Sequence, residues 1–151
     1  MDAFRGFMSG LFATVLWAGM LGLGAYRGEP LDLPWMLGTA FLEPTEPYTW
    51  GVGAAGVVLL GAIFGLVHAQ VYEEWRRSGP IIGGIVGLLH AAVAGTALGF
   101  VAGYHPHMPE LIPDPGYFGA NIGPDVVTIF LAAHVLYGMA TGSLYRPESK
   151  P

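Results

Sequence analysis

Four apolar segments without a single charged residue divide the chain into candidate spans and polar connections. They run approximately over 6–26, 50–72, 81–104 and 126–145. About 20 apolar residues are enough to cross the hydrocarbon core of a bilayer as an α-helix. Lipid offers backbone groups no hydrogen-bond partner, and the segments lack the strict alternation of barrel strands, so the pattern favours helices. It predicts an all-α integral membrane four-helix bundle, with residues 1–151 as a single transmembrane domain.

The composition agrees with a membrane location. Of the 151 residues, 53% are hydrophobic and 11% are charged, whereas a soluble domain has about a quarter charged residues. The chain has no cysteine, which excludes disulfides, thiolate-ligated iron–sulfur clusters and covalently attached c-type haem. The first span is longer than the apolar part of a typical signal peptide, and no small-residue cleavage site follows it, so we expect it to remain as a helix.

The basic residues fall mainly on one side of the predicted bundle. Those on that side are Arg5, Arg76, Arg77, Arg146 and Lys150. Only Arg27 lies on the other side, together with the acidic residues Glu29, Asp32, Glu43, Glu46, Glu110, Asp114 and Asp125. By the positive-inside rule, this distribution predicts a multi-pass protein of the cytoplasmic (inner) membrane with both termini in the cytoplasm.

The two connections on the acidic side differ in character. The first contains Leu-Asp-Leu-Pro-Trp-Met-Leu-Gly at 31–38, where Pro34 suits the first turn of a helix and the apolar residues can cover one side. We therefore expect a short interfacial helix in the first outer loop. The second connection, 105–124, contains five prolines and three glycines, which favour an ordered outer loop without regular structure.

Glycines spaced four residues apart recur in every span. They are Gly6 and Gly10, Gly61 and Gly65, Gly83 and Gly87, Gly95, Gly99 and Gly103, and Gly138 and Gly142. Helices in lipid associate through small residues that let their backbones approach, so these positions predict the contact faces of the bundle. Segments 61–71 and 83–93 are also identical at seven positions, which fits either an inverted repeat or coincidence in a glycine-rich chain.

Histidines inside the spans are candidate functional residues, because exposing an ionisable side chain to lipid is costly. His90 and His134 each share a helix face with small or aromatic residues, so they are predicted to face the interior at similar depths near the midplane. The sequence leaves open whether they are in contact. They are candidate ligands for a b-type haem or for Cu or Zn. Alternatively, each bonds a carbonyl or a hydroxyl and holds helices together. His68 is expected to form a separate site or a polar end-cap, and Tyr137 shares the face of His134.

A second cluster follows the third span, in the sequence Tyr-His-Pro-His-Met at 104–108. Proline favours extended geometry before it, so His105 and His107 can point to one side and chelate Cu or Zn, with Met108 attractive to Cu(I). The alternative is an interfacial turn whose histidines bond loop carbonyls.

Other chemistry has little support in the sequence. There is no H-E-x-x-H motif, phosphate loop or dinucleotide fingerprint, and no basic patch for nucleic acid. The spans contain no Asp, Glu, Lys or Arg that would serve as a coupling site for transport. A pore would require several copies of a four-helix chain.

Several stretches together resemble the pattern of a family of small prokaryotic four-helix membrane proteins of unknown function. These are 7–14, 31–38, 87–95, 105–123 and 133–138. The resemblance implies a four-helix fold and singles out His90, the 105–107 segment, Pro115-Gly116, Asn121 and His134. It implies no activity.

The sequence as a whole favours a non-enzymatic accessory or scaffold protein of the inner membrane. Its expected partners are the lipid bilayer and other membrane subunits or further copies of itself. One alternative is a b-type haem or transition-metal protein that uses His90 and His134 for electron transfer or metal handling. Another is a small oligomeric transporter or channel.

Overall fold

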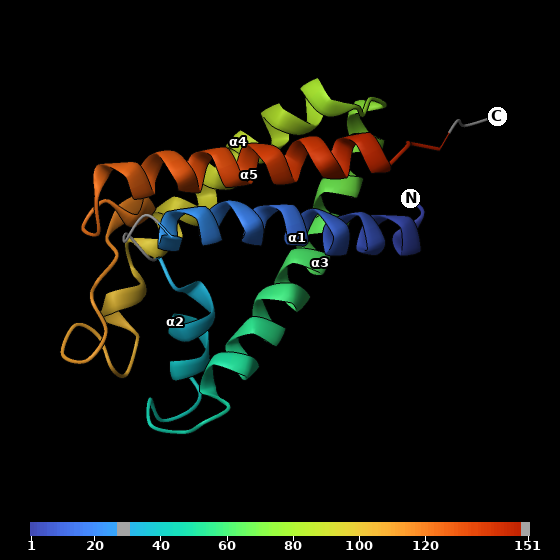
Figure 1. The fold of residues 1–151 in the computed structure, drawn as a ribbon. Helices are drawn as coiled ribbons and strands as arrows, with labels where there is room; N and C mark the ends of the chain where they lie inside the picture. Colours follow the sequence, from blue (N-terminus) through green and yellow to red (C-terminus); the bar gives the residue numbers. More distant parts are fainter. Residues whose placement is uncertain (27–30, 149–151) are drawn as a thin grey trace.

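The computed structural model describes residues 1–26 and 31–148. Arg27, Glu29 and Lys150, which entered the topology prediction, lie outside the described residues. Five α-helices follow one another along the chain: α1 (Ala3–Tyr26), α2 (Leu33–Thr39), α3 (Thr49–Trp75), α4 (Pro80–Leu98) and α5 (Pro124–Leu144) (Figure 1). Two short 3₁₀ turns, η1 (Val101–Gly103) and η2 (Tyr117–Gly119), lie between α4 and α5, and the described residues contain no strand.

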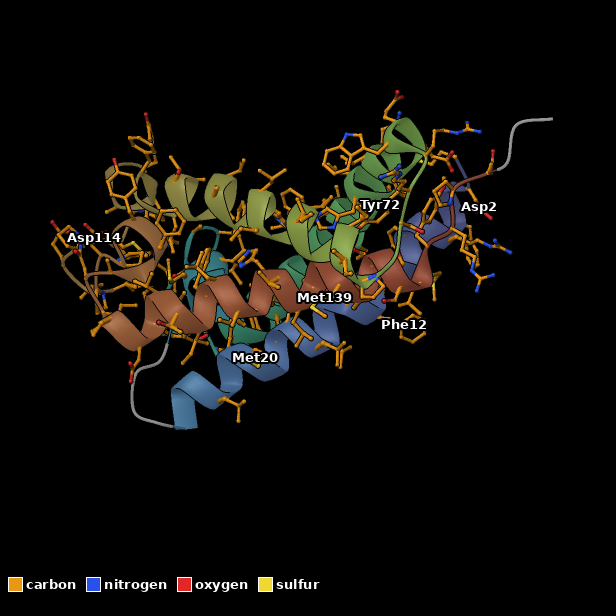
Figure 2. All side chains as sticks on the ribbon, turned by 90° about the horizontal axis from the view of Figure 1, so that it is seen from above. Asp2, Phe12, Met20, Tyr72, Asp114 and Met139 are labelled. Carbon is orange, nitrogen blue, oxygen red and sulfur yellow. The ribbon has the colours of Figure 1, made fainter. Side chains whose placement is uncertain are left out.

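The four long helices confirm the predicted all-α membrane fold. Each of α1, α3, α4 and α5 is long and apolar enough to cross a bilayer. Large apolar side chains such as Phe12, Leu89 and Val93 are exposed on the outside of the bundle, as expected where the surrounding medium is lipid. Figure 2 shows Asp2 at one end of the molecule and Asp114 at the other, with Phe12 and Met139 between them. The protein is therefore a helical membrane protein.

The short helix predicted in the first loop is present as α2. Asp32 caps it, because its carboxylate accepts the Trp35 N–H at 2.9 Å, and Pro34 occupies the first turn as predicted. Met36 and Thr39 on this helix are buried. The helix lies beside the first half of α3 (Figure 1).

The third predicted span, 81–104, ends earlier as an α-helix than the apolar pattern indicates. α4 stops at Leu98, and the chain continues through η1 with the tighter bonds Gly103 N–H to Phe100 O and Tyr104 N–H to Val101 O. Such short 3₁₀ segments are common beyond helix termini. The change of winding directs the chain into the segment 104–123, which we call the long loop.

Backbone contacts between glycines hold the long helices in two pairs. In the first pair, a methyl group at Gly10 of α1 would collide with the backbone of Gly65 of α3. In the second pair, a methyl group at Gly83 of α4 would collide with the carbonyl oxygen of Gly138 of α5. Only hydrogen at these positions allows the helix axes to approach so closely. The glycine pattern thus predicted these contact faces correctly.

The pairs join through α1 and α5, which lie side by side, while α3 and α4 touch in few places (Figure 1). The first half of α3 lies with α2, away from α4 and α5. The last glycines of the third span do not contact another long helix. Gly95 and Gly99 instead accommodate the rings of Phe118 and Tyr117 from the long loop.

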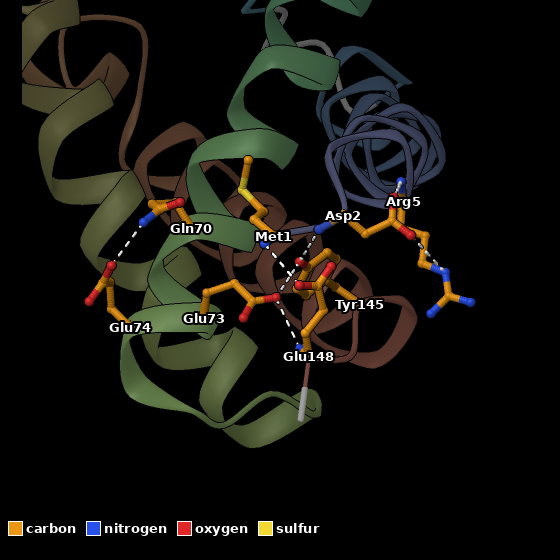
Figure 3. A network of polar contacts seen from close by, with 8 residues as sticks. All are labelled: Met1, Asp2, Arg5, Gln70, Glu73, Glu74, Tyr145 and Glu148. Atoms are coloured by element: carbon orange, nitrogen blue, oxygen red, sulfur yellow. Dashed lines mark hydrogen bonds and ion pairs between the residues drawn. The ribbon is translucent and has the colours of Figure 1, made fainter. Parts of the chain in front are cut away.

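The described ends of the chain, Met1 and Glu148, lie together at one end of the bundle, where the Met1 amino group is 3.3 Å from Glu148 Oε2. We call this the terminal end; the opposite end, with α2 and the long loop, is the loop end. At the terminal end Tyr145 donates to the Glu73 carboxylate at 2.7 Å and accepts the Asp2 N–H at 3.1 Å (Figure 3). Burial, followed by the bond to Glu73, raises the pKa of the Tyr145 hydroxyl to about 12. The hydroxyl therefore stays a donor at neutral pH and ties α1, α3 and the end of α5 together.

We expect Gly83→Ala to destabilise the protein by about 1–3 kcal/mol, because the added methyl forces α4 away from the α5 backbone. Gly84→Ala is the matched control, since the nearest atom to its methyl is Met139 Cγ at 3.4 Å, an ordinary contact. The measurement is thermal unfolding of both variants in the same detergent, followed by circular dichroism. Equal unfolding temperatures for the two variants would contradict the role given to the Gly83 contact.

Candidate functional site

Three histidines from three helices form a row in the interior of the bundle. His90 of α4 lies in the middle, with its ring centroid 5.0 Å from that of His134 on α5 and 5.2 Å from that of His68 on α3. Both ring pairs are nearly perpendicular, at 89° and 80°. His90 and His134 were predicted to face the interior at similar depths, and the structure adds that their rings are in contact.

His68 belongs to this row, although the sequence was interpreted as placing it in a separate site or an end-cap. The similarity of 61–71 and 83–93 contained a signal for this arrangement, since His68 and His90 occupy matching positions in the two segments. Gly65 packs on α1 and Gly87 packs on α5. The matched segments therefore use their glycines in equivalent ways and bring their histidines together.

Hydrogen bonds fix one side of His68 and leave the other free. Its Nδ1 lies 3.0 Å from the hydroxyl of Thr141, which is itself 2.9 Å from the hydroxyl of Tyr72. The side chain is 2% exposed, and its Nε2 is buried without a hydrogen-bond partner among the described residues. A buried polar atom without a partner is costly and points to a role beyond packing.

His134 has a defined tautomer. Its Nδ1 lies 2.8 Å from the carbonyl oxygen of Phe130, and because a carbonyl only accepts, Nδ1 must carry the proton. In the neutral ring Nε2 then has a lone pair and is an acceptor. The Trp17 indole N–H also points at Nδ1, from 3.5 Å. This contact is at the limit of a hydrogen bond, so the much shorter bond to the Phe130 carbonyl decides the tautomer.

His90 has aromatic neighbours on two sides. Its ring is tilted against Phe64 at 4.2 Å and lies 5.8 Å from the ring of Tyr137. Its Nδ1 is buried and has no partner among the described residues. Tyr137 also approaches His68, at 5.1 Å, and donates its hydroxyl to the Gly61 carbonyl. Tyr137 is thus a fixed wall of the site rather than a free polar group.

A cavity of about 580 Å³ adjoins His90 and His134. All five α-helices contribute to its lining, which is mainly apolar and contains no Asp, Glu, Lys or Arg. It lies where α3 diverges from α4, and the lining residues Leu60, Phe100 and Tyr104 are exposed. Because these residues lie on the outside of a membrane bundle, the cavity opens toward lipid. Sequence reasoning did not find this cavity, since the divergence of two helices has no local signature.

The geometry at His90 and His134 does not fit a haem held between them. A haem held by two histidines lies between their imidazoles, with about 4 Å between the two ligating nitrogens. The helices that carry the histidines must therefore stand far enough apart for the porphyrin ring. One turn from His90, however, a methyl at Gly87 would collide with the carbonyl oxygen of His134. The α4 and α5 backbones are therefore too close together for a porphyrin ring to lie between them.

The described residues contain no group of three or more His, Asp or Glu side chains that would hold a metal ion. An ion bound by only two of the imidazoles stays a prediction.

The histidines of the long loop are not arranged as a chelating pair. His105 Nδ1 accepts the His107 backbone N–H at 3.2 Å, so its Nε2 donates to the Met36 carbonyl at 2.9 Å. Both nitrogens are thus committed. Met108 is 5% exposed and packs in the apolar cluster at the loop end, while His107 Nε2 lies 3.9 Å from a Glu43 carboxylate oxygen. His105 connects the long loop to α2, as in the alternative interpretation of an interfacial turn.

Comparison with known proteins finds no family model, no curated protein and no solved structure that matches this chain. Functional inference therefore rests on the row of His68, His90 and His134 and on the adjoining cavity.

We expect His105→Ala to lower the free energy of unfolding by about 1–3 kcal/mol, because it removes the bond to the Met36 carbonyl and leaves the His107 N–H without its acceptor. His107→Ala is the control, since its side chain has only the long contact with Glu43. Thermal unfolding in detergent measures both. If His107→Ala is as damaging as His105→Ala, the structural role of His105 is wrong.

Proposed function

We propose that this protein is a non-enzymatic binding component of the cytoplasmic membrane, which holds a small apolar molecule taken from the lipid phase. The observation that supports this function is the 580 Å³ cavity with His90 and His134 in its wall. In this role the protein serves as an accessory subunit of a larger membrane system. It takes part either as a single copy or as an assembly of several copies.

The size and chemistry of the cavity support ligand binding. Sites for small molecules occupy about 300–1,000 Å³ and combine apolar walls with a few placed polar groups. Here apolar side chains such as Leu33, Phe64 and Leu98 form most of the wall. The imidazoles of His90 and His134 supply polar groups, while His105, which also lines the cavity, uses both nitrogens within the protein. A ligand that has an apolar body and a small polar head matches this arrangement.

Binding is favoured over turnover and over transport by the same lining. General acid–base catalysis requires a group that exchanges a proton with the substrate and is restored afterwards. The Nδ1 proton of His134 is committed to the Phe130 carbonyl. Ion-coupled transport uses charged groups within the membrane, and the cavity lining has none. Neutral imidazoles position a polar head without either process.

The proposed orientation places the terminal end in the cytoplasm. Arg5 follows the first residues of α1, Arg76 and Arg77 lie between α3 and α4, and Arg146 follows α5. Acidic residues such as Glu43 and Asp114 lie in the connections of the loop end. The positive-inside rule therefore supports cytoplasmic termini, which puts α2 and the long loop on the outer face. The cavity then opens in the outer half of the membrane.

We expect the protein purified from membranes in mild detergent to carry an apolar molecule that organic solvent extracts. Ala94→Phe fills the cavity, because Ala94 lines it, and this variant should lose the molecule. Ala92→Phe is the control: it lies on the same helix, is exposed and does not line the cavity, so it should keep the molecule. Native mass spectrometry measures the bound mass in all three proteins.

The proposed function would be refuted if both variants carry the same bound mass. It would also be refuted if the unaltered protein carries no bound molecule. Near-stoichiometric iron or copper in its place would support the metal-binding alternative.

A further inference from the structure

We infer that the ligand of this cavity carries a hydroxyl group, and that this hydroxyl binds between His134 and His90. The inference rests on the proposed function and specifies the chemical class of the ligand. Three imidazoles line the cavity, those of His90, His105 and His134. Both nitrogens of His105 are bonded within the protein, so the inference follows from the hydrogen-bond roles of His90 and His134.

His134 offers the cavity an acceptor only. The Phe130 carbonyl holds the proton of the ring on Nδ1, so the Nε2 lone pair is the group left to bind a ligand. The side chain is 4% exposed, and its hydrogen bonds among the described residues are made by Nδ1 and not by Nε2. A ligand head must accordingly donate a hydrogen bond, which excludes esters, ethers and ketones as the best partners.

His90 can take the complementary role because its own tautomer is not fixed by a backbone group. Its buried Nδ1 has no partner among the described residues, and the neighbouring His68 Nε2 is in the same condition. An orphaned buried N–H is rarer in proteins than an orphaned acceptor, so the lone pair of the neutral His90 ring belongs on Nδ1 and its proton on Nε2, which makes the ring a donor.

One hydroxyl group satisfies both imidazoles at the same time. Its hydrogen is donated to His134 Nε2, and its oxygen accepts from His90 Nε2–H. The ring centroids of His90 and His134 are 5.0 Å apart, which suits a single bridging oxygen better than a large polar head. An apolar molecule with one hydroxyl, such as an alkylated phenol, thus matches the wall of the cavity and its two polar groups.

The test compares 4-octylphenol with its methyl ether, which has the same apolar body and no hydroxyl hydrogen. Each probe carries a bromine on its alkyl chain, because bromine quenches tryptophan fluorescence and Trp17 lines the cavity. The Trp17→Phe variant measures how much of the quenching comes from the other tryptophans. The Ala94→Phe variant, whose cavity is filled, measures the quenching by probe that is only dissolved in the detergent. Binding is measured at neutral pH in one detergent.

We expect the phenol to bind at least tenfold more tightly than the ether. His134→Phe should reduce this ratio to about one while the ether still binds, because phenylalanine keeps the apolar wall and removes the acceptor. His107→Phe is the matched control and should keep the preference, since His107 does not line the cavity.

The possible outcomes separate the two proposals. If neither probe quenches Trp17 above the Ala94→Phe background, the proposed function fails for this class of molecule. If phenol and ether bind equally, the cavity binds apolar molecules but the hydroxyl inference is wrong. A preference that survives in a folded His134→Phe variant would also overturn the inference.

Discussion

The contact between the α4 and α5 backbones determines where the other groups of the site lie. Gly83 meets Gly138, and one turn further on Gly87 meets the carbonyl oxygen of His134. No residue with a side chain permits this approach, and in lipid such close packing is a principal attraction between helices. Because the contact fixes α4 on α5, the ring of His90 lies against the ring of His134, and α3 is left to diverge toward α2. The cavity is the space that this divergence leaves.

Hydrogen-bond supply is the second constraint, because water does not reach the interior of a membrane bundle. Most polar side chains there have partners nearby: Thr14 bonds the Gly10 carbonyl, Tyr137 bonds the Gly61 carbonyl, and His134 bonds the Phe130 carbonyl. The unpartnered nitrogens of His68 and His90 are exceptions, and they lie in one row. Unsatisfied polar atoms gathered beside a cavity favour function over packing as the reason for these histidines.

Sequence reasoning predicted those features that depend on local pattern. The uncharged spans predicted the four long helices, and the segment with Asp32 and Pro34 predicted α2. The glycine spacing predicted the contacts of α1 with α3 and of α4 with α5. Helix periodicity also predicted that His90 and His134 face the interior at similar depths, but not that their rings touch. The place of His68 could not be predicted in this way, because it depends on how steeply α3 crosses the bundle. The commitment of His105 to Met36 depends equally on a tertiary contact between α2 and the long loop.

The central claim is that the bundle presents a fixed hydrogen-bond acceptor, His134 Nε2, to a lipid-facing cavity. The most direct measurement is ¹⁵N solid-state magnetic resonance of histidine-labelled protein in lipid bilayers, with the His134 signals assigned from a His134→Gln sample. The account predicts a proton on Nδ1 and none on Nε2 for His134, because the Phe130 carbonyl holds the proton at 2.8 Å. A His134 ring protonated on Nε2, alone or together with Nδ1, would contradict it.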